Sequence, residues 1–242
     1  MTDFRARIHH DPGVEDQTLV DISTDAVAIT PLRDAAEIFD REITAYERYA
    51  KPALDIIGGA ILAVLTAPLF LVAAAAIYLT MGGPVLLRQQ RIGRFGKTFT
   101  IYKFRTMEPD RRNQQVAYIG EDRRKTHKHP QDPRITPVGQ FLRTWSLDEI
   151  PQFINVIKGD MSLVGPRPEM VDIVAQYEPW QHRRHAVKPG ITGPWQISER
   201  GDKPLHECTQ SDLTYIDSLS FFHDLKILAL TPLAALGIRR GI

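Results

Sequence analysis

Two adjacent acidic residues, Asp148 and Glu149, stand in the run "SLDEIPQFINVIKGDMSLVGPRP". Pro151 is tolerated only near the start of a helix, so the pair is expected in or beside a first helical turn. The helix dipole favours ionised carboxylates at that position. A capping box with Ser146 would account for Glu149 structurally. Capping does not need a second acid, so two carboxylates in one turn indicate chemistry.

Cations that suit phosphate groups occur on both sides of this pair. Arg167 lies between two prolines that fix the backbone torsions, so its side chain starts from a preset direction. An arginine fork matches phosphate oxygens in bidentate fashion, although a structural partner in a turn is the alternative. Strand alternation places Lys103 and Arg105 on one face, where they suit a phosphate group or a solvated edge equally well.

Carboxylates gathered among such cations are typical of a site that acts on a phosphorylated lipid or nucleotide. Magnesium is the expected cofactor, because it binds carboxylate and phosphate oxygens together. The cations expected to contact phosphate are Lys103, Arg105, Arg143 and Arg167.

The acid pair has to be positioned by the helix that follows it, and Gly159 is expected to end that helix. The spacing i, i+3, i+4, i+7 predicts one buried face, made by Ile150, Phe153, Ile154 and Ile157. Upstream, the run "GPVLLRQQRIGRFGKTFTIYKFRTM" predicts two strands joined by a turn that contains Gly96. This hairpin would carry Lys103 and Arg105.

A long apolar segment precedes the hairpin, with no charged residue from Ile56 to Leu87. About 20 apolar residues cross the core of a bilayer, so the segment is long enough for a membrane helix. A buried core helix is the alternative, but a chain of this size rarely buries a helix that is apolar on all sides. Membrane insertion is therefore the favoured interpretation.

Pro68 lies near the middle of that segment and predicts a bend, because it removes a helical hydrogen bond. The Thr66 hydroxyl is expected to bond a carbonyl that the break frees. Basic residues favour the cytoplasmic side and occur both before and after the segment. We therefore expect a re-entrant helix rather than a straight span. The two basic clusters are Arg41, Arg48 and Lys51 before the segment and Arg88, Arg91, Arg94 and Lys97 after it.

The remaining features limit the possible partners, disulfides and metal sites. The 30 basic and 29 acidic side chains nearly cancel, so net charge nominates no partner, and nucleic acid is not expected. One cysteine, Cys208, excludes an intrachain disulfide framework and fits a reducing compartment. The histidines in "THKHP" and "HRRH" are interpreted as solvated surface rather than metal ligands. The run "LKILALTPLAALGI" is too short to span and is expected to lie in the membrane interface or in the core.

Several ordered runs resemble the bacterial polyprenyl-phosphate sugar-1-phosphate transferases, the monotopic phosphoglycosyl transferases of glycan assembly. The resemblance covers residues 51–242 and leaves residues 1–50 outside it. The runs are "YKFRTM", "DPRITPVGQFLRTWSLDEIPQFINVIKGDMSLVGPRPEM", "KPGITGPWQIS" and "LTYIDSLSFFHDLKIL".

This resemblance implies transfer of a sugar-1-phosphate from a UDP-sugar to undecaprenyl phosphate with release of UMP, the initiating step of exopolysaccharide or other cell-surface glycan synthesis. It implies that Asp148 is the nucleophile, through an aspartyl-phosphosugar intermediate, and that Glu149 supports Mg2+. Two positions depart from the family pattern: Ala67 stands where a serine often precedes the proline, and Pro52 follows Lys51 where the family often has Lys-Arg. Both departures concern the bend of the helix and leave the chemistry unaffected. The implied phosphate-binding residues are Lys103, Arg105, Arg143, Arg167, Lys188 and Arg200.

The expected fold is a mixed, mostly helical α/β catalytic domain with one N-terminal re-entrant membrane helix and interfacial amphipathic helices. Residues 1–50 would form an acidic polar extension, residues 51–80 the re-entrant helix broken at Pro68, and residues 81–242 a cytoplasmic phosphoglycosyl transferase domain. The expected location is the cytoplasmic face of the bacterial inner (plasma) membrane, as a monotopic protein. A homo-oligomer is left open.

Two other functions are weighed against this one. A non-catalytic membrane scaffold of a polysaccharide assembly complex is the alternative, and the acid pair with its basic partners counts against it. A phospholipid head-group transferase is disfavoured, because such enzymes are expected to have several spanning helices.

Overall fold

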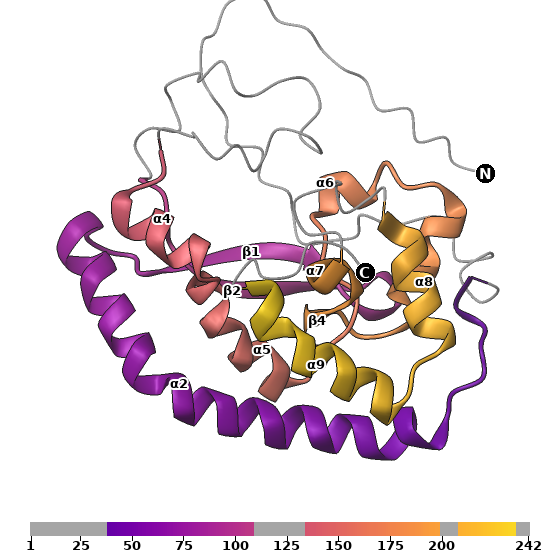
Figure 1. Ribbon diagram of the computed structural model, residues 1–242. Helices are drawn as coiled ribbons and strands as arrows, with labels where there is room; N and C mark the ends of the chain where they lie inside the picture. Colours follow the sequence, from indigo (N-terminus) through magenta and orange to yellow (C-terminus); the bar gives the residue numbers. More distant parts are fainter. Residues whose placement is uncertain (1–37, 109–133, 199–207, 236–242) are drawn as a thin grey trace, which may run out of the picture.

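A computed structural model describes residues 38–108, 134–198 and 208–235 of the chain. These residues form a mixed, mostly helical fold, as the sequence predicts, with two small sheets (Figure 1). The strands are β1 (Leu86–Ile92), β2 (Thr98–Phe104), β3 (Ser162–Val164) and β4 (Gly190–Thr192). The helices are η1 (Tyr46–Ala50), α2 (Lys51–Met81), η2 (Arg94–Gly96), α4 (Pro137–Thr144), η4 (Leu147–Gln152), α5 (Phe153–Lys158), α6 (Val171–Val174), η5 (Pro179–Ala186), α7 (Pro194–Ser198), α8 (Thr209–Asp217) and α9 (Phe221–Ala235).

The two sheets differ in kind. β1 and β2 form the predicted antiparallel hairpin, in a register that runs from Leu86 opposite Phe104 to Ile92 opposite Thr98. Gly96 lies in the turn with a φ of 74°, which a residue without Cβ adopts at little cost. β3 and β4 pair in parallel over a few residues. Strand β2 of the hairpin packs against η4, the 3-10 helix that carries the acid pair.

Two clusters of buried apolar side chains hold these elements together. One joins the C-terminal part of α2 to α4 and β2, through residues such as Ile77 and Leu142. The other lies among α5, β3, α8 and α9, and its buried members are Ile101, Val156, Met161, Leu163, Val164, Val187, Leu213, Tyr215, Ile216, Leu219 and Ile227. Leu62 of α2 packs against the second cluster, so the long helix takes part in both.

Helix α2 lies along the domain and is bent (Figure 1). Pro68 is inside it and lacks the N–H that the Val64 carbonyl would otherwise accept. The Thr66 hydroxyl donates to the Leu62 carbonyl at 2.7 Å, one helical turn earlier. That carbonyl already has a helical donor available, so the prediction that Thr66 bonds a freed carbonyl is wrong.

Both ends of α2 are bonded to the same domain. At its N-terminal end, Lys51 Nζ donates to an Asp224 carboxylate oxygen of α9 at 2.6 Å. One turn later, an Asp55 carboxylate oxygen accepts hydrogen bonds from Ser162 Oγ at 2.9 Å and from the Leu163 N–H at 3.0 Å. Gly59 permits the close approach, because a Cβ there would lie 2.9 Å from a Val156 methyl carbon. The C-terminal end is held through main-chain carbonyls, described below.

The outer surface of α2 is apolar. Of the described residues, the continuous helix Tyr46–Met81 is the one long and apolar enough to cross a membrane, judged by length and composition alone, and little of it is buried. Its exposed large apolar side chains are Tyr49, Leu54, Ile56, Ile57, Ile61, Val64, Leu65, Leu69, Leu71, Val72, Tyr78 and Leu79.

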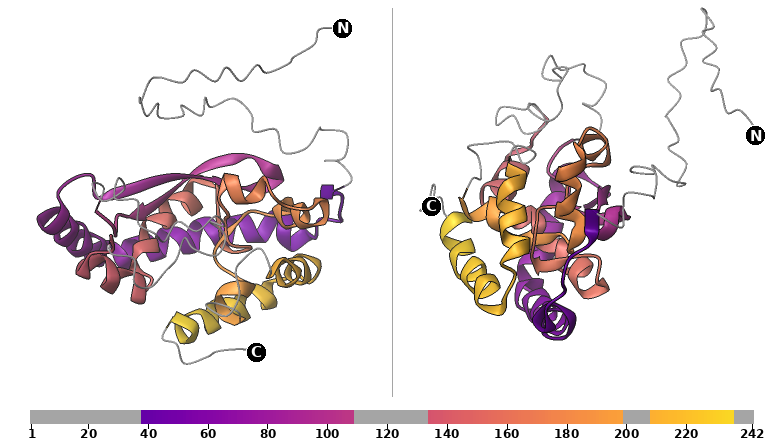
Figure 2. Two further views of the ribbon diagram at one scale, coloured as in Figure 1. Left: turned by 90° about the horizontal axis from the view of Figure 1, so that it is seen from above. Right: turned by 90° about the vertical axis from the view of Figure 1, so that its right-hand side faces the viewer.

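Helices α9 and α5 add further exposed apolar side chains. Asp224 in the first turn of α9 binds Lys51 at the start of α2, while Figure 2 shows the rest of α9 apart from α2. α9 exposes Phe221, Phe222 and Leu225 and buries Ile227. The C-terminal apolar run is therefore not simply a core helix.

The prediction of a buried face on α5 is wrong for Ile154 and Ile157, and its other two residues, Ile150 and Phe153, are half-buried. Ile154 and Ile157 are 41% and 42% exposed, whereas Asn155 and Val156 are fully buried. The short helix turns Asn155 toward the β2 backbone and Val156 toward Gly59 of α2, so Ile154 and Ile157 are left more exposed.

Candidate active site

The acid pair occupies the first turn of η4, as its position before Pro151 predicts. The capping explanation for Glu149 is wrong, however. Ser146 has a left-handed backbone conformation, with φ 56°, and its side chain makes no capping hydrogen bond. This sharp turn separates α4 from η4 and leaves the Glu149 carboxylate available for other partners.

Glu149 binds two of the predicted cations. Its Oε1 accepts a hydrogen bond from Lys103 Nζ at 3.0 Å and one from Arg167 Nη2 at 2.6 Å. Its Oε2 lies 3.4 Å from Arg167 Nη1. These three largely buried side chains come from η4, β2 and the loop after β3, so three separate elements meet at one carboxylate.

The pKa values of the two carboxyl groups are shifted in opposite directions. Burial would raise the pKa of Glu149, but the charges of Arg167 and Lys103 outweigh it and hold that pKa well below its usual range. Burial raises the pKa of Asp148, and the neighbouring Glu149 charge raises it further against the opposing cations. Glu149 is thus a fixed anion, and Asp148 is the more basic carboxyl of the pair.

A third cation lies on the Asp148 side. The positive charge of Arg143 favours the ionised form of Asp148, together with those of Lys103 and Arg167. Arg143 extends from the last turn of α4, and its Nε donates to Thr106 Oγ1 at 2.8 Å. The structure therefore brings together Asp148, Glu149, Lys103, Arg143 and Arg167.

Arg105 lies elsewhere. Its guanidinium donates to the carbonyls of Met81 at 2.8 Å, of Gly83 at 3.2 Å and of Gly82, where it satisfies the C-terminal end of α2. β2 ends at Phe104, so the alternation that pairs Arg105 with Lys103 no longer applies one residue later. The phosphate-binding role predicted for Arg105 therefore has no support in its contacts.

Lys188, a further predicted phosphate ligand, makes no hydrogen bond or ion pair to either acid of the pair in the part of the chain that the structure describes. The Lys188 Nζ lies at the end of α5, 3.5 Å from the position that a Cβ on Gly159 would take. Gly159 does end that helix, with φ 82°, as predicted. Arg200 falls outside the described residues.

Asn155 is a positioning residue that the sequence pattern does not reveal. Its amide nitrogen donates to the Thr100 carbonyl at 2.7 Å, and its amide oxygen accepts the Tyr102 N–H at 3.1 Å. The side chain is fully buried and so bonds α5 to the backbone of β2 beside Lys103. A polar residue between apolar neighbours in a predicted buried helix was the one available signal.

The interpretation of "HRRH" as solvated surface is also wrong. His182, Arg184 and His185 are buried, and only Arg183 in that run makes an exposed ion pair. Charged runs are normally solvated, and the Arg184 partner, Asp212, is too distant in sequence to be recognised locally. The "THKHP" run lies outside the described residues.

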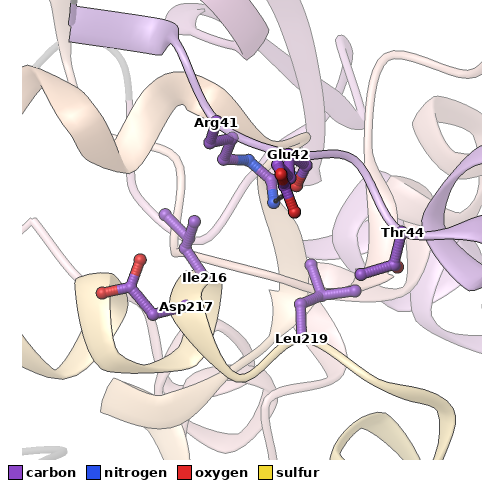
Figure 3. A pocket seen from close by; sticks show the side chains of 6 residues that line it. All are labelled: Arg41, Glu42, Thr44, Ile216, Asp217 and Leu219. Atoms are coloured by element: carbon purple, nitrogen blue, oxygen red, sulfur yellow. Dashed lines mark hydrogen bonds between the residues drawn. The ribbon is translucent and has the colours of Figure 1, made fainter.

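A cavity of about 210 Å³ occurs at a different place, between the segment before η1 and the end of α8 (Figure 3). None of the acid-pair residues or their cations contributes to it, so it is separate from the candidate active site. Its lining residues are Arg41, Glu42, Thr44, Ile216, Asp217 and Leu219.

The bacterial sugar transferase family matches residues 46–237, which is most of the chain. The chain belongs to this family. All five residues that the structure gathers at the site lie within the matched part of this bacterial sugar transferase.

Similar proteins share the same region. The chain is 42% identical over 181 residues to the uncharacterized sugar transferase EpsL of Bacillus subtilis, a match that covers 75% of this chain and 84% of EpsL. It is 38% identical to the exopolysaccharide production protein ExoY of Rhizobium meliloti, over 79% of this chain and 87% of ExoY.

A longer relative matches only in part. The chain is 39% identical to the UDP-glucose:undecaprenyl-phosphate glucose-1-phosphate transferase of Escherichia coli, over 80% of this chain but 42% of that protein. This sugar transferase thus corresponds to less than half of that enzyme.

Proposed function

We propose that this sugar transferase moves a sugar-1-phosphate from a UDP-sugar to undecaprenyl phosphate, releases UMP, and does so through a covalent intermediate on Asp148. The observation that carries the proposal is the division of roles within the acid pair. Glu149 is neutralised by Lys103 and Arg167, while Asp148 is the more basic carboxyl beside the same cations. The names of the relatives supply the substrate class.

In the first step, an Asp148 carboxylate oxygen attacks the phosphorus that carries the sugar. An O–P bond forms, and the bond from that phosphorus to the UMP oxygen breaks, so UMP leaves with the electron pair. Arg167 and Arg143 are suited to neutralise the phosphate charges, because guanidinium groups bind phosphate oxygens in bidentate fashion. The cations lower the cost of bringing an anionic nucleophile to an anionic diphosphate.

In the second step, a phosphate oxygen of undecaprenyl phosphate attacks the same phosphorus. The Asp148–phosphorus bond breaks, the carboxylate is regenerated, and the sugar is left on a polyprenyl diphosphate. Two displacements at one phosphorus, with UMP lost before the acceptor reacts, give ping-pong kinetics.

The carboxylates fit magnesium, which commonly uses one or two carboxylates together with substrate phosphates. No group of three or more metal-binding side chains occurs in the described residues, so substrate oxygens would have to complete the coordination. Asp148 and Glu149 would hold the metal, and within the described part of the chain Glu149 Oε2 makes only a 3.4 Å contact, to Arg167 Nη1, which leaves it available as a ligand. When bound, magnesium supplies charge neutralisation on the diphosphate.

Membrane insertion of α2 belongs to the same proposal. The helix has an apolar outer surface, a proline at its bend, and both ends bonded to one domain. A straight span would place its two ends on opposite sides of the bilayer, about 30 Å apart. We therefore infer a re-entrant helix that enters from the cytoplasmic face of the inner membrane, with the exposed apolar residues of α9 in the interface.

Thiol labelling tests this topology. In a Cys208→Ser background, single cysteines at the exposed positions Arg48 and Gln90 are expected to stay unlabelled by an impermeant thiol reagent in intact cells. Both should react once the membrane is permeabilised, which serves as the matched control. Labelling of one position but not the other in intact cells would show that the helix spans the bilayer.

Release of UMP by the purified protein tests the activity. A panel of UDP-sugars, each with undecaprenyl phosphate and magnesium, is expected to give UMP with at least one donor. A scaffold without catalytic function would release UMP with none of them, and this outcome would favour the alternative role in a polysaccharide assembly complex.

A further inference from the structure

The loop that carries Arg167 is held in an unusual way. Pro166 and Pro168 have no N–H groups, so the loop is anchored largely through its carbonyls. The Pro166 carbonyl accepts the Gly190 N–H at 2.9 Å. The Arg167 carbonyl accepts a hydrogen bond from the side chain of Arg184, at 3.0 Å. The main chain at Arg167 is thus fixed by a second arginine.

Arg184 is itself constrained on several sides. It is 1% exposed, its Nη1 donates to the Tyr177 hydroxyl at 2.7 Å, and its Nη2 forms an ion pair with Asp212 at 2.6 Å. Asp212 comes from α8 and is fully buried as well. A planar guanidinium with three partners in fixed directions has one orientation available, which a lysine could not reproduce.

A buried ion pair is weak evidence for stability, because desolvation offsets much of the attraction. Its value as a positioning device is a separate matter. Arg184 holds the Arg167 carbonyl, and the Arg167 backbone in turn positions the Arg167 guanidinium. That guanidinium binds Glu149 at 2.6 Å and stacks over Trp195, with Cζ 5.6 Å from the ring centre. Displacing the Arg167 main chain would move both contacts.

We propose that Arg184, held by Asp212 and Tyr177, is a positioning residue that sets the place of the Arg167 guanidinium at the acid pair. This inference extends the proposed function, since it assigns the support of one of its phosphate-binding groups. Arg184 acts through Arg167 and has no direct role toward substrate.

Trp195 reports the position of Arg167 without any reaction. In a Trp145→Phe, Trp180→Phe background, which removes two exposed tryptophans, Trp195 is the remaining emitter. Both Arg167→Ala and Arg184→Gln are expected to change its emission. Adding Arg184→Gln to Arg167→Ala should change it no further, because the stacked group is already absent. A shift from Arg184→Gln that is equally large in the Arg167→Ala background would overturn the proposal.

Turnover gives the second readout. UMP release is expected to fall about 10- to 100-fold in Arg184→Gln, the loss typical of a misplaced catalytic group. In the Arg167→Ala background the same substitution should cost less than about twofold. Arg183→Gln is the matched control: the neighbouring arginine makes an exposed ion pair with Asp217 and should leave emission and turnover unchanged.

Tyr177→Phe provides a gentler test if Arg184→Gln does not fold. It removes one hydrogen bond to Arg184 and keeps the ion pair with Asp212. A smaller change in Trp195 emission is expected, again absent in the Arg167→Ala background, and an emission identical to the parent would overturn the proposal. The emission data do not require UDP-sugar, so a lack of UMP release by the parent protein would reject the proposed function and leave this inference decided separately.

Discussion

Asparagine in place of Asp148 is expected to abolish covalent labelling by a UDP-sugar that carries radiolabel in its sugar. An amide is a poor nucleophile toward phosphorus, and UMP release should fall on the order of 10⁴-fold or more. The side chain keeps its shape. Because burial and Glu149 raise the pKa of Asp148, its charged form is disfavoured in the fold, so a neutral amide should not lower the melting temperature.

Two outcomes of this experiment would contradict the role assigned to Asp148. Label that survives denaturation in Asp148→Asn would place the nucleophile elsewhere. In the wild-type protein, UMP that appears only when undecaprenyl phosphate is present would argue for direct transfer without a covalent intermediate. Asp217→Asn is the matched control: it makes the same chemical change in an exposed ion pair away from the acid pair, and it should leave labelling and UMP release unchanged.

Glutamine in place of Glu149 is expected to reduce turnover by about 10²- to 10³-fold, the size of effect seen when one charge-stabilising group is removed. The largely buried Lys103 and Arg167 would lose their shared counter-charge. The magnesium concentration for half-maximal activity should also rise, because a carboxylate oxygen is lost. Activity would be followed by UMP release across a magnesium titration.

The stability effects of the two substitutions should have different signs. The cations depress the pKa of Glu149, so its ionised form favours the folded state above the ordinary carboxyl pKa, and this contribution is lost as the pH falls. Glu149→Gln should therefore lower the melting temperature at neutral pH, whereas Asp148→Asn should not. An equal loss of stability in both variants would contradict the assigned charge states.

The local parts of the site were predictable from sequence. Pro151 marks the first turn that holds the acid pair, Gly159 ends α5, and Gly96 lies in the hairpin turn, because each imposes a backbone conformation on its immediate neighbours. The mostly helical fold and the long apolar helix follow from composition and length.

What the sequence did not predict depends on contacts between distant segments. The inward side of α5 is set by the bonds of Asn155 to β2 and by the contact of Val156 with Gly59, both with segments far away in the sequence. Arg105 and Arg167 are both arginines beside a strand, yet one binds the end of α2 and the other binds Glu149. Arg184 reads as one charge in a solvated run until Asp212 of α8 is placed beside it.

The bond from Lys51 to Asp224 joins positions 173 residues apart, and this separation bears on how the protein is made. From Met81, where α2 ends, to Asp224, a ribosome needs roughly 7–29 s at about 5–20 residues per second. Throughout this time α2 is complete but its anchor on α9 does not exist. The exposed apolar side chains of α2 therefore lack this support until α9 has been translated, and a bilayer or a chaperone is what would cover them in the meantime.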